Sequence, residues 1–193
     1  MSPARPDALD RFVRALEAGW RETGGEESAL LPRVEALMRE LVASDDWLDP
    51  ARARPHPQYY QQHLLHLDPE ERFSVVSFVW GPGQQTPIHD HTVWGVIGML
   101  RGEERSQPYA LDGAGVPRPA GDEERLRPGD VACVSPRIGD VHRVRNAHDD
   151  RVSISIHAYG TNIGKQMRHV FDARSGARKD FVSGYSNAAN APA

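Results

Sequence analysis

Cysteine and long apolar stretches are scarce in this chain, and each scarcity excludes a class of protein. The single cysteine, Cys133, excludes an internal disulfide and a thiolate-rich zinc site, and its apolar setting in VACV indicates a buried, unreactive thiol. No apolar run approaches the roughly 20 residues that a membrane span needs. The N-terminus has no apolar core of the kind a signal peptide carries. We therefore expect a cytoplasmic protein without membrane contact.

An excess of positive charge is also absent. The 23 Lys and Arg residues are outnumbered by 27 Asp and Glu residues, and the net charge is −4. A nucleic-acid-binding protein would need a concentrated basic face, so we expect no nucleic-acid partner. At 193 residues the chain is long enough for one well-buried domain. It is expected to be a monomer or a small homo-oligomer.

Residues 1–46 carry two apolar stripes at helical spacing. Leu9, Phe12 and Leu16 are three or four residues apart, and a second stripe runs from Leu31 to Val42 after two glycines. Asp7 is suited to cap the first helix. The sequence therefore predicts a helical segment over 1–46, packed on the outside of the domain that follows.

From about residue 47 the pattern changes to short strands. Runs rich in β-branched and aromatic residues alternate with Gly, Pro and Asp turns, which is typical of an antiparallel sandwich or barrel. We predict a mainly β domain over 47–175, a polar loop over 112–124, and a C-terminal segment over 176–193 that ends a hairpin around ARSGAR and then frays at SNAANAPA. The predicted strands are 73–80, 93–100, 130–135, 140–145 and 151–159.

Two histidines lie two residues apart in PIHDHTVW. On a strand, residues i and i+2 face the same way, so His89 and His91 can converge on one metal ion. On a helix the same pair would diverge by about 200°. The following residues, VWGVIGML, favour a strand. An H-x-H pair by itself remains a weak signal for a metal site.

The spacing around this pair strengthens the signal. The segment reads G-x5-H-x-H-x3-G-x6-G, and a later segment reads P-x2-G-x2-H-x3-N and contains His142. These segments resemble the two motifs of the cupin superfamily, whose members are jelly-roll β-barrels with a metal inside. The resemblance implies that His142 completes the ligand set. The chain departs from the pattern at Gly95, where cupins carry a glutamate ligand, and by one extra residue between Pro136 and Gly139.

Without that glutamate, three neutral imidazoles would hold the metal. Such a site keeps the full 2+ charge of the ion and leaves up to three open positions, enough for a chelating substrate and dioxygen. The common non-haem iron set contains a carboxylate. A three-histidine set suits a substrate that supplies its own negative charge, as a thiolate does.

A second group of polar residues alternates along RVSISIHAY. Ser155, His157 and Tyr159 share one face of the predicted strand and can form a hydrogen-bonded row. Taken alone, the row is equally compatible with a strand whose polar face meets water. Inside a barrel it would point inward, next to the metal, and its polar atoms would need partners.

The combination of three histidines, a missing glutamate and Ser-x-His-x-Tyr is similar to the thiol dioxygenases of the cysteine dioxygenase type I family. The resemblance covers most of residues 47–175. It implies ferrous iron, Fe(II), held by the three histidines, a small thiol bound as thiolate, and addition of both atoms of O2 to sulfur. It also implies that Ser155, His157 and Tyr159 act around the metal.

Two positions bear on the substrate. Animal members of this family have a Tyr-x-Arg segment whose arginine binds the substrate carboxylate, whereas this chain has Tyr60-Gln61-Gln62. It is therefore similar to the bacterial glutamine-type enzymes, which favour 3-mercaptopropionate over cysteine. In that branch a C-terminal arginine binds the carboxylate, and Arg168 in KQMRHV matches it. Tyr60, Gln62 and Arg168 are thus the predicted substrate-binding residues.

Two alternatives stay open. One is a cupin metalloenzyme of another reaction class, and the other is a non-catalytic cupin that binds a small molecule. The remaining histidines lie in segments that indicate surface or structural roles; they are His56, His63, His66, His148 and His169.

Overall fold

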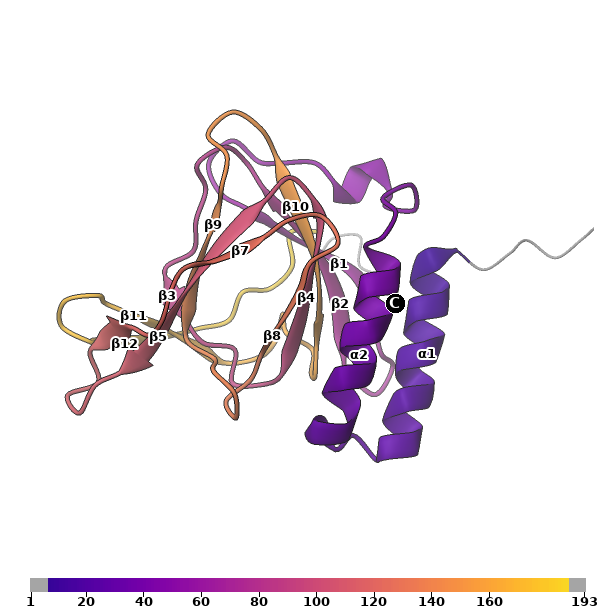
Figure 1. Ribbon diagram of the computed structural model, residues 1–193, viewed down its shortest axis with the longest axis horizontal. Helices are drawn as coiled ribbons and strands as arrows, with labels where there is room; N and C mark the ends of the chain where they lie inside the picture. The colour runs from indigo at the N-terminus through magenta and orange to yellow at the C-terminus, as the bar shows by residue number, and fades with distance from the viewer. Residues whose placement is uncertain (1–6, 188–193) are drawn as a thin grey trace, which may run out of the picture.

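The computed structural model describes residues 7–187, and two helices begin the chain. Helix α1 spans Ala8–Thr23 and helix α2 spans Glu27–Leu41. The Asp7 carboxylate caps α1 by accepting a hydrogen bond from the Asp10 backbone N–H. The helices lie side by side along one wall of the β-barrel, as predicted (Figure 1). Neither combines the length and hydropathy that crossing a membrane requires.

The wall beneath the helices is a five-stranded antiparallel sheet in the order β1-β2-β10-β4-β8. Residues from both helices and from the facing strands form one apolar core, which includes Leu16, Leu30, Met38, Val96 and Ile156, all fully buried. The strands are β1 Gln61–Leu67, β2 Ser74–Trp80, β4 Gly95–Arg101, β8 Val131–Val134 and β10 Ser153–Tyr159.

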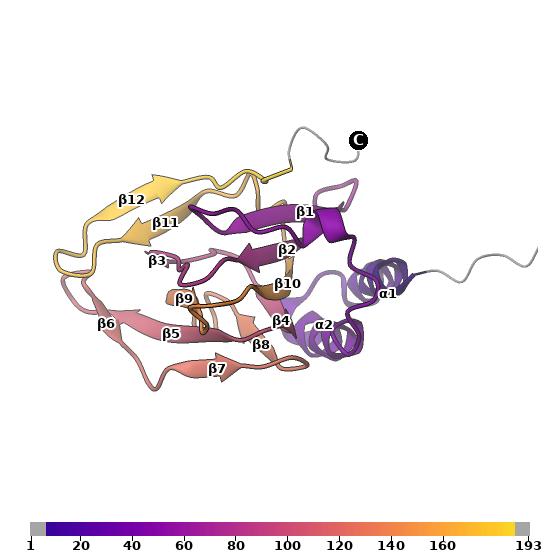
Figure 2. The ribbon, with the colours of Figure 1, turned by 90° about the horizontal axis from the view of Figure 1, so that it is seen from above.

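The opposite wall is a seven-stranded sheet in the order β12-β11-β3-β9-β5-β6, with β7 also paired to β5. The β11–β12 hairpin lies on the side of the molecule away from the helices (Figure 2). The strands are β3 Ile88–His89, β5 Glu104–Leu111, β6 Pro117–Pro119, β7 Glu124–Leu126, β9 His142–Asn146, β11 Arg168–Phe171 and β12 Arg178–Phe181. A short 3-10 turn, Pro50–Arg52, joins the helices to β1. The predicted mainly β jelly-roll barrel with outer helices is confirmed.

Strand β10 shows how alternation places the polar row. Ile154, Ile156 and Ala158 belong to the core beneath the helices. The intervening side chains, Ser155 and His157, therefore face the barrel interior, since successive strand residues point to opposite faces. All seven residues of β10 are buried, so the reading of a half-exposed strand is wrong.

Two local predictions were wrong. The segment 112–124 is not only a loop, because it contains β6, which pairs with β5. This short strand is held by its backbone pairing, and its proline-rich, mostly exposed side chains show no apolar alternation that would predict it. The tail does not fray at its beginning: the Asn187 side chain bonds both backbone groups of Leu64, and Ser186 bonds the backbone of Gln62. Residues 188–193 lie outside the described residues.

Candidate metal centre

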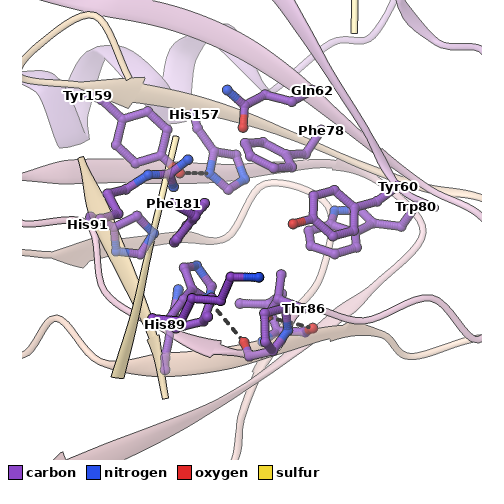
Figure 3. Close-up of a pocket in the computed structure, with 16 residues that line it drawn as sticks. Tyr60, Gln62, Phe78, Trp80, Thr86, His89, His91, His157, Tyr159 and Phe181 are labelled. Atoms are coloured by element: carbon purple, nitrogen blue, oxygen red, sulfur yellow. Dashed lines mark hydrogen bonds between the residues drawn. The ribbon is translucent and has the colours of Figure 1, made fainter. Parts of the chain in front are cut away.

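The three predicted ligands meet inside the barrel. His89 and His142 face each other across the paired strands β3 and β9. The expectation that His89 and His91 share a strand was wrong: β3 ends at His89, and His91 lies in the following loop, where its backbone N–H and ring are hydrogen-bonded to Asp140. The ring centroids are 4.8 to 4.9 Å apart in all three pairs. One ring nitrogen of each histidine lies within 4.8 Å of the other two. Figure 3 shows His89 and His91 on the wall of this pocket.

Hydrogen bonds leave one nitrogen of each of these rings free for a metal. His89 Nδ1 lies 3.1 Å from the Pro87 carbonyl oxygen, and His91 Nδ1 lies 3.0 Å from Asp140 Oδ1. Both oxygens can only accept, so Nδ1 carries the hydrogen and Nε2 keeps its lone pair. An imidazole fixed in this way is the usual arrangement of a metal-binding histidine.

The third histidine, His142, is hydrogen-bonded to a hydroxyl group, which can donate or accept. Its Nδ1 lies 3.0 Å from Ser106 Oγ on the neighbouring strand β5. Burial lowers the pKa of His142 and of His89 well below the usual value, and the neighbouring histidines add to the effect. Neutral rings with free lone pairs are what a divalent cation requires, so the residues fit a metal.

Asp140 is a part of the site that the sequence did not reveal. Besides His91 Nδ1, its carboxylate accepts the backbone N–H groups of His91 at 3.0 Å and of Thr92 at 2.9 Å. Burial opposes the charge, but the hydrogen bonds from His91 and the backbone lower the pKa of Asp140. Nothing in its sequence context separates it from other loop aspartates, although it lies two residues before His142.

The row on β10 forms with both hydrogen bonds that alternation predicts. Ser155 Oγ lies 2.8 Å from His157 Nε2. His157 Nδ1 lies 2.8 Å from the Tyr159 hydroxyl, the bond drawn between these two side chains in Figure 3. Burial lowers the pKa of His157 well below its usual value and raises the pKa of Tyr159 well above its own. Both groups are therefore neutral near pH 7. The Tyr159 ring stacks on His91 at 5.5 Å, which joins the row to the metal centre.

Gly95, where cupins carry a glutamate, faces Tyr159 across β4 and β10. A Cβ atom at Gly95 would lie 2.8 Å from Tyr159 Cε1, closer than van der Waals contact permits. The tyrosine ring therefore occupies the space that a glutamate ligand would need. The single cysteine, Cys133, lies on β8 opposite Val96. Burial raises the pKa of its thiol to about 11, as expected for an unreactive cysteine.

A cavity of about 240 Å³ opens beside the histidines and takes in every predicted site residue except Ser155. Sixteen residues line it (Figure 3), and they include two cations, Arg168 and Lys179, but no acidic residue. Its volume is below the usual range for drug-sized ligands. The pocket therefore suits a small anion.

Arg168 is buried, 3% exposed, on β11. In the part of the chain described here it has no carboxylate within salt-bridge distance, and its Nε has no hydrogen-bond partner. One terminal N–H group donates to Ser183 Oγ at 2.7 Å, and the guanidinium lies 4.7 Å above the Phe181 ring. Burial lowers the pKa of Arg168. A buried cation with free donors is poised to bind an anionic group.

The other two predicted substrate residues also reach this cavity. The Gln62 amide donates to the Gly184 carbonyl at 3.1 Å and to Ser183 Oγ at 3.3 Å, so Gln62 and Arg168 share Ser183 as a partner. The ring of Tyr60 lies 4.8 Å from that of Trp80 at the pocket wall. Burial raises the pKa of Tyr60.

Of the remaining histidines, His169 has a defined role in the site. Its Nδ1 lies 2.6 Å from Asp90 Oδ2, and its backbone N–H donates to Asp90 Oδ1 at 2.7 Å. Asp90 lies between His89 and His91 in the sequence. These hydrogen bonds therefore connect β11, which carries Arg168, to the segment that carries the two metal-binding histidines. The segments of His63, His66 and His169 are strands rather than loops: His63 and His66 lie on β1, and His169 lies on β11.

Comparison with known proteins decides the family. The family profile described as "Cysteine dioxygenase type I" matches residues 34–174, most of the chain. The chain belongs to the cysteine dioxygenase type I family. It is 30% identical over 172 residues to "Cysteine dioxygenase type 1" from Homo sapiens, covering 87% of this chain and 79% of the relative. It is 28% identical over 181 residues to the Bos taurus protein of the same name, covering 92% and 86%.

A solved structure described as a "Cupin 2 conserved barrel domain protein" from Salinispora arenicola is also similar. It is 20% identical, with a TM-score of 0.43, and the match covers 60% of this chain and 86% of that one.

Proposed function

We propose that this protein is an iron(II)-dependent thiol dioxygenase whose preferred substrate is 3-mercaptopropionate, with cysteine as a poorer one. Both atoms of O2 are added to the thiolate sulfur, RS⁻ + O2 → RSO2⁻, so that atoms and charge balance. The observation that carries the proposal is the cluster of three histidines that shares a cavity with Arg168, a buried cation with no acidic partner among residues 7–187. Membership of the cysteine dioxygenase type I family supports it.

His89, His91 and His142 would hold the iron. Imidazole ligands suit iron, zinc and copper alike, so the donor set permits ferrous iron and the family favours it. When bound, ferrous iron supplies the one-electron chemistry by which dioxygen reacts with a thiolate. The three neutral ligands leave the charge of the cation for an anionic sulfur to balance.

The chain's own side chains would position the substrate. Arg168 would bind its carboxylate in a partly dry pocket, where charge-assisted hydrogen bonds are strong. Gln62 would support Arg168 through their shared partner Ser183, and Tyr60 would close the pocket wall. Tyr159 would donate its hydroxyl hydrogen to the reacting oxygen, oriented by His157, whose far nitrogen is held by Ser155.

The charge of the pocket supports the substrate preference. Cysteine carries an ammonium group that 3-mercaptopropionate lacks. Among the described residues, the pocket lining offers two cations and no carboxylate, so an ammonium group would be left without an ionic partner and would face like charge. Cysteamine, which has an ammonium group and no carboxylate, should be the poorest of the three thiols.

Oxygen consumption and product analysis test the proposal directly. The iron-loaded protein is given 3-mercaptopropionate, cysteine or cysteamine under 18O2, and the products are analysed by mass spectrometry. We expect one sulfinate per O2 consumed, both oxygen atoms labelled, and kcat/KM falling in the order 3-mercaptopropionate, cysteine, cysteamine. Absence of sulfinate from all three thiols would refute the proposal.

The same protein separates the two alternatives. Stoichiometric zinc in protein purified without added metal would favour another cupin reaction. Binding of thiols without oxygen consumption would favour a small-molecule-binding cupin. The cytoplasmic location, the lack of nucleic-acid or membrane partners and the monomer or small homo-oligomer remain predictions from the sequence.

A further inference from the structure

Glu104 is a buried acid behind the polar row. It begins β5, is 2% exposed, and faces the side chains of Ser155 and Trp80. Its Oε1 has no hydrogen-bond partner, and no cation lies within salt-bridge distance of it among residues 7–187. Burial raises the pKa of this carboxyl to about 7, while hydrogen bonding from Ser155 and Trp80 partly offsets the rise.

The titratable groups around Glu104 do not supply a compensating charge. A small cavity beside it is also lined by Glu124 from β7, Cys133 from β8, His142 from β9 and His157 from β10. Burial raises the pKa of Cys133 and lowers the pKa of both histidines, so these three groups are neutral near pH 7. Glu124 is acidic and exposed. Among the described residues, no neighbouring titratable group therefore carries a positive charge that would balance the Glu104 carboxylate.

The hydrogen bonds of the polar row, Ser155–His157–Tyr159, can have either of two donor–acceptor directions. Because His157 is neutral and both ring nitrogens are hydrogen-bonded, one nitrogen donates and the other accepts. If Nδ1 donates to the Tyr159 oxygen, the tyrosine hydroxyl hydrogen is free to point into the pocket. If Nδ1 accepts, the hydroxyl hydrogen is used within the row. Only the first direction leaves Tyr159 able to donate to a substrate.

The hydroxyl of Ser155 decides the direction, since it has a single hydrogen. In the first direction that hydrogen goes to His157 Nε2. A carboxylate at Glu104 would compete for it, because hydrogen bonds to charged acceptors are the stronger ones. A neutral carboxyl group does not compete in this way and can itself donate to Ser155 Oγ.

We propose that Glu104 is a positioning residue for Tyr159: as a neutral acid it leaves the Ser155 hydrogen to His157 and turns the Tyr159 hydrogen into the pocket, and as a carboxylate it reverses the row. Glu104 acts through Ser155 and His157 and does not touch the substrate. The inference deepens the proposed function and rests on it, because it assigns the acid that controls the donor in the dioxygenase reaction.

Activity against pH gives the first test. The kcat of the iron-loaded wild-type protein is measured at saturating 3-mercaptopropionate from pH 5.5 to 9, beside Glu104→Gln, which stays uncharged and keeps a hydrogen-bond donor. Since a positioned proton donor contributes roughly 100-fold or more to a rate, we expect the ratio of Glu104→Gln to wild-type kcat to rise at least about tenfold between pH 6 and pH 8.5. Glu124→Gln, which removes the other carboxylate at the same cavity, should follow the wild type. A flat ratio for Glu104→Gln would overturn the inference.

The second test does not depend on turnover. Nitrogen-15 NMR of the full chain loaded with diamagnetic zinc reports which nitrogen of His157 carries the hydrogen, and His157→Gln assigns the signal. We expect the hydrogen on Nδ1 below pH 7 and on Nε2 above it in the wild type, and on Nδ1 throughout in Glu104→Gln. One unchanged tautomer over the whole range in the wild type would refute the role of Glu104. Failure to form sulfinate at any pH would refute the proposed function and leave this result standing.

Discussion

Replacing Arg168 by Gln tests how the pocket selects its substrate. The change keeps hydrogen-bonding capacity but removes a buried positive charge that has no acidic partner in the described part of the chain. In the wild type we expect the guanidinium to form two charge-assisted hydrogen bonds to the substrate carboxylate. Losing them should cost about 2 to 4 kcal/mol of binding free energy. That loss corresponds to a fall of about 30-fold to 1000-fold in kcat/KM for 3-mercaptopropionate.

The assay compares two thiols of nearly the same shape. Oxygen consumption is measured with 3-mercaptopropionate and with its amide, 3-mercaptopropionamide, which has no charge. The wild type should strongly prefer the acid, and Arg168→Gln should lose most of that preference. Arg178→Gln, an exposed position on the same hairpin, removes the same charge outside the pocket and should behave as the wild type.

Stability distinguishes a lost ligand contact from a damaged fold. Arg168→Gln loses the hydrogen bond to Ser183 and the contact with the Phe181 ring. It also removes a desolvated charge, which opposes that loss. We therefore expect the free energy of unfolding to change by less than about 1 kcal/mol. If kcat/KM falls by the same factor for the acid and the amide, Arg168 does not bind the carboxylate and the reasoning is wrong.

Three further predictions follow from buried contacts. Asp140→Ala should weaken metal binding about 10-fold to 100-fold, because His91 loses its acceptor; competition with a coloured chelator measures this, and unchanged affinity would contradict it. The folded-state pKa of Glu104 is raised from 4.5 to about 7, so wild-type stability is lost as pH rises from 4.5 to 7 and stays low above it. A shift of about 2.5 pH units at 1.36 kcal/mol per unit lowers the free energy of unfolding of the wild type by about 3 kcal/mol between pH 4.5 and pH 8. Glu104→Gln lacks this group, so its free energy of unfolding should rise by that amount relative to the wild type over the same range. Urea denaturation at the two pH values, with zinc bound to both proteins, checks the gain, and a pH-independent difference would contradict it. Gly95→Ala should push the Tyr159 ring aside and cost about 1 to 3 kcal/mol of stability; a wild-type melting temperature and kcat would show that the ring tolerates a side chain there.

Much of the fold and the centre of the site could be predicted because local periodicity carries them. The 3.6-residue stripes before Val42 place the two helices, and the alternation of β10 places Ser155, His157 and Tyr159 on one face. The strands β1 and β5 were not predicted. Their polar side chains are only half-buried or exposed in many places, so no clean apolar alternation marks them.

What the sequence by itself determined is therefore the polar row on one face of a strand and, through their motifs, the H-x-H pair and His142. The tertiary structure alone decided which side chains lose contact with water and which atoms they then meet. Asp140 and Glu104 look like ordinary surface charges in the sequence, and only the family resemblance singles out Arg168. All three are enclosed because strands distant in the chain pair beside one another, and the free energy of a charge depends on that enclosure.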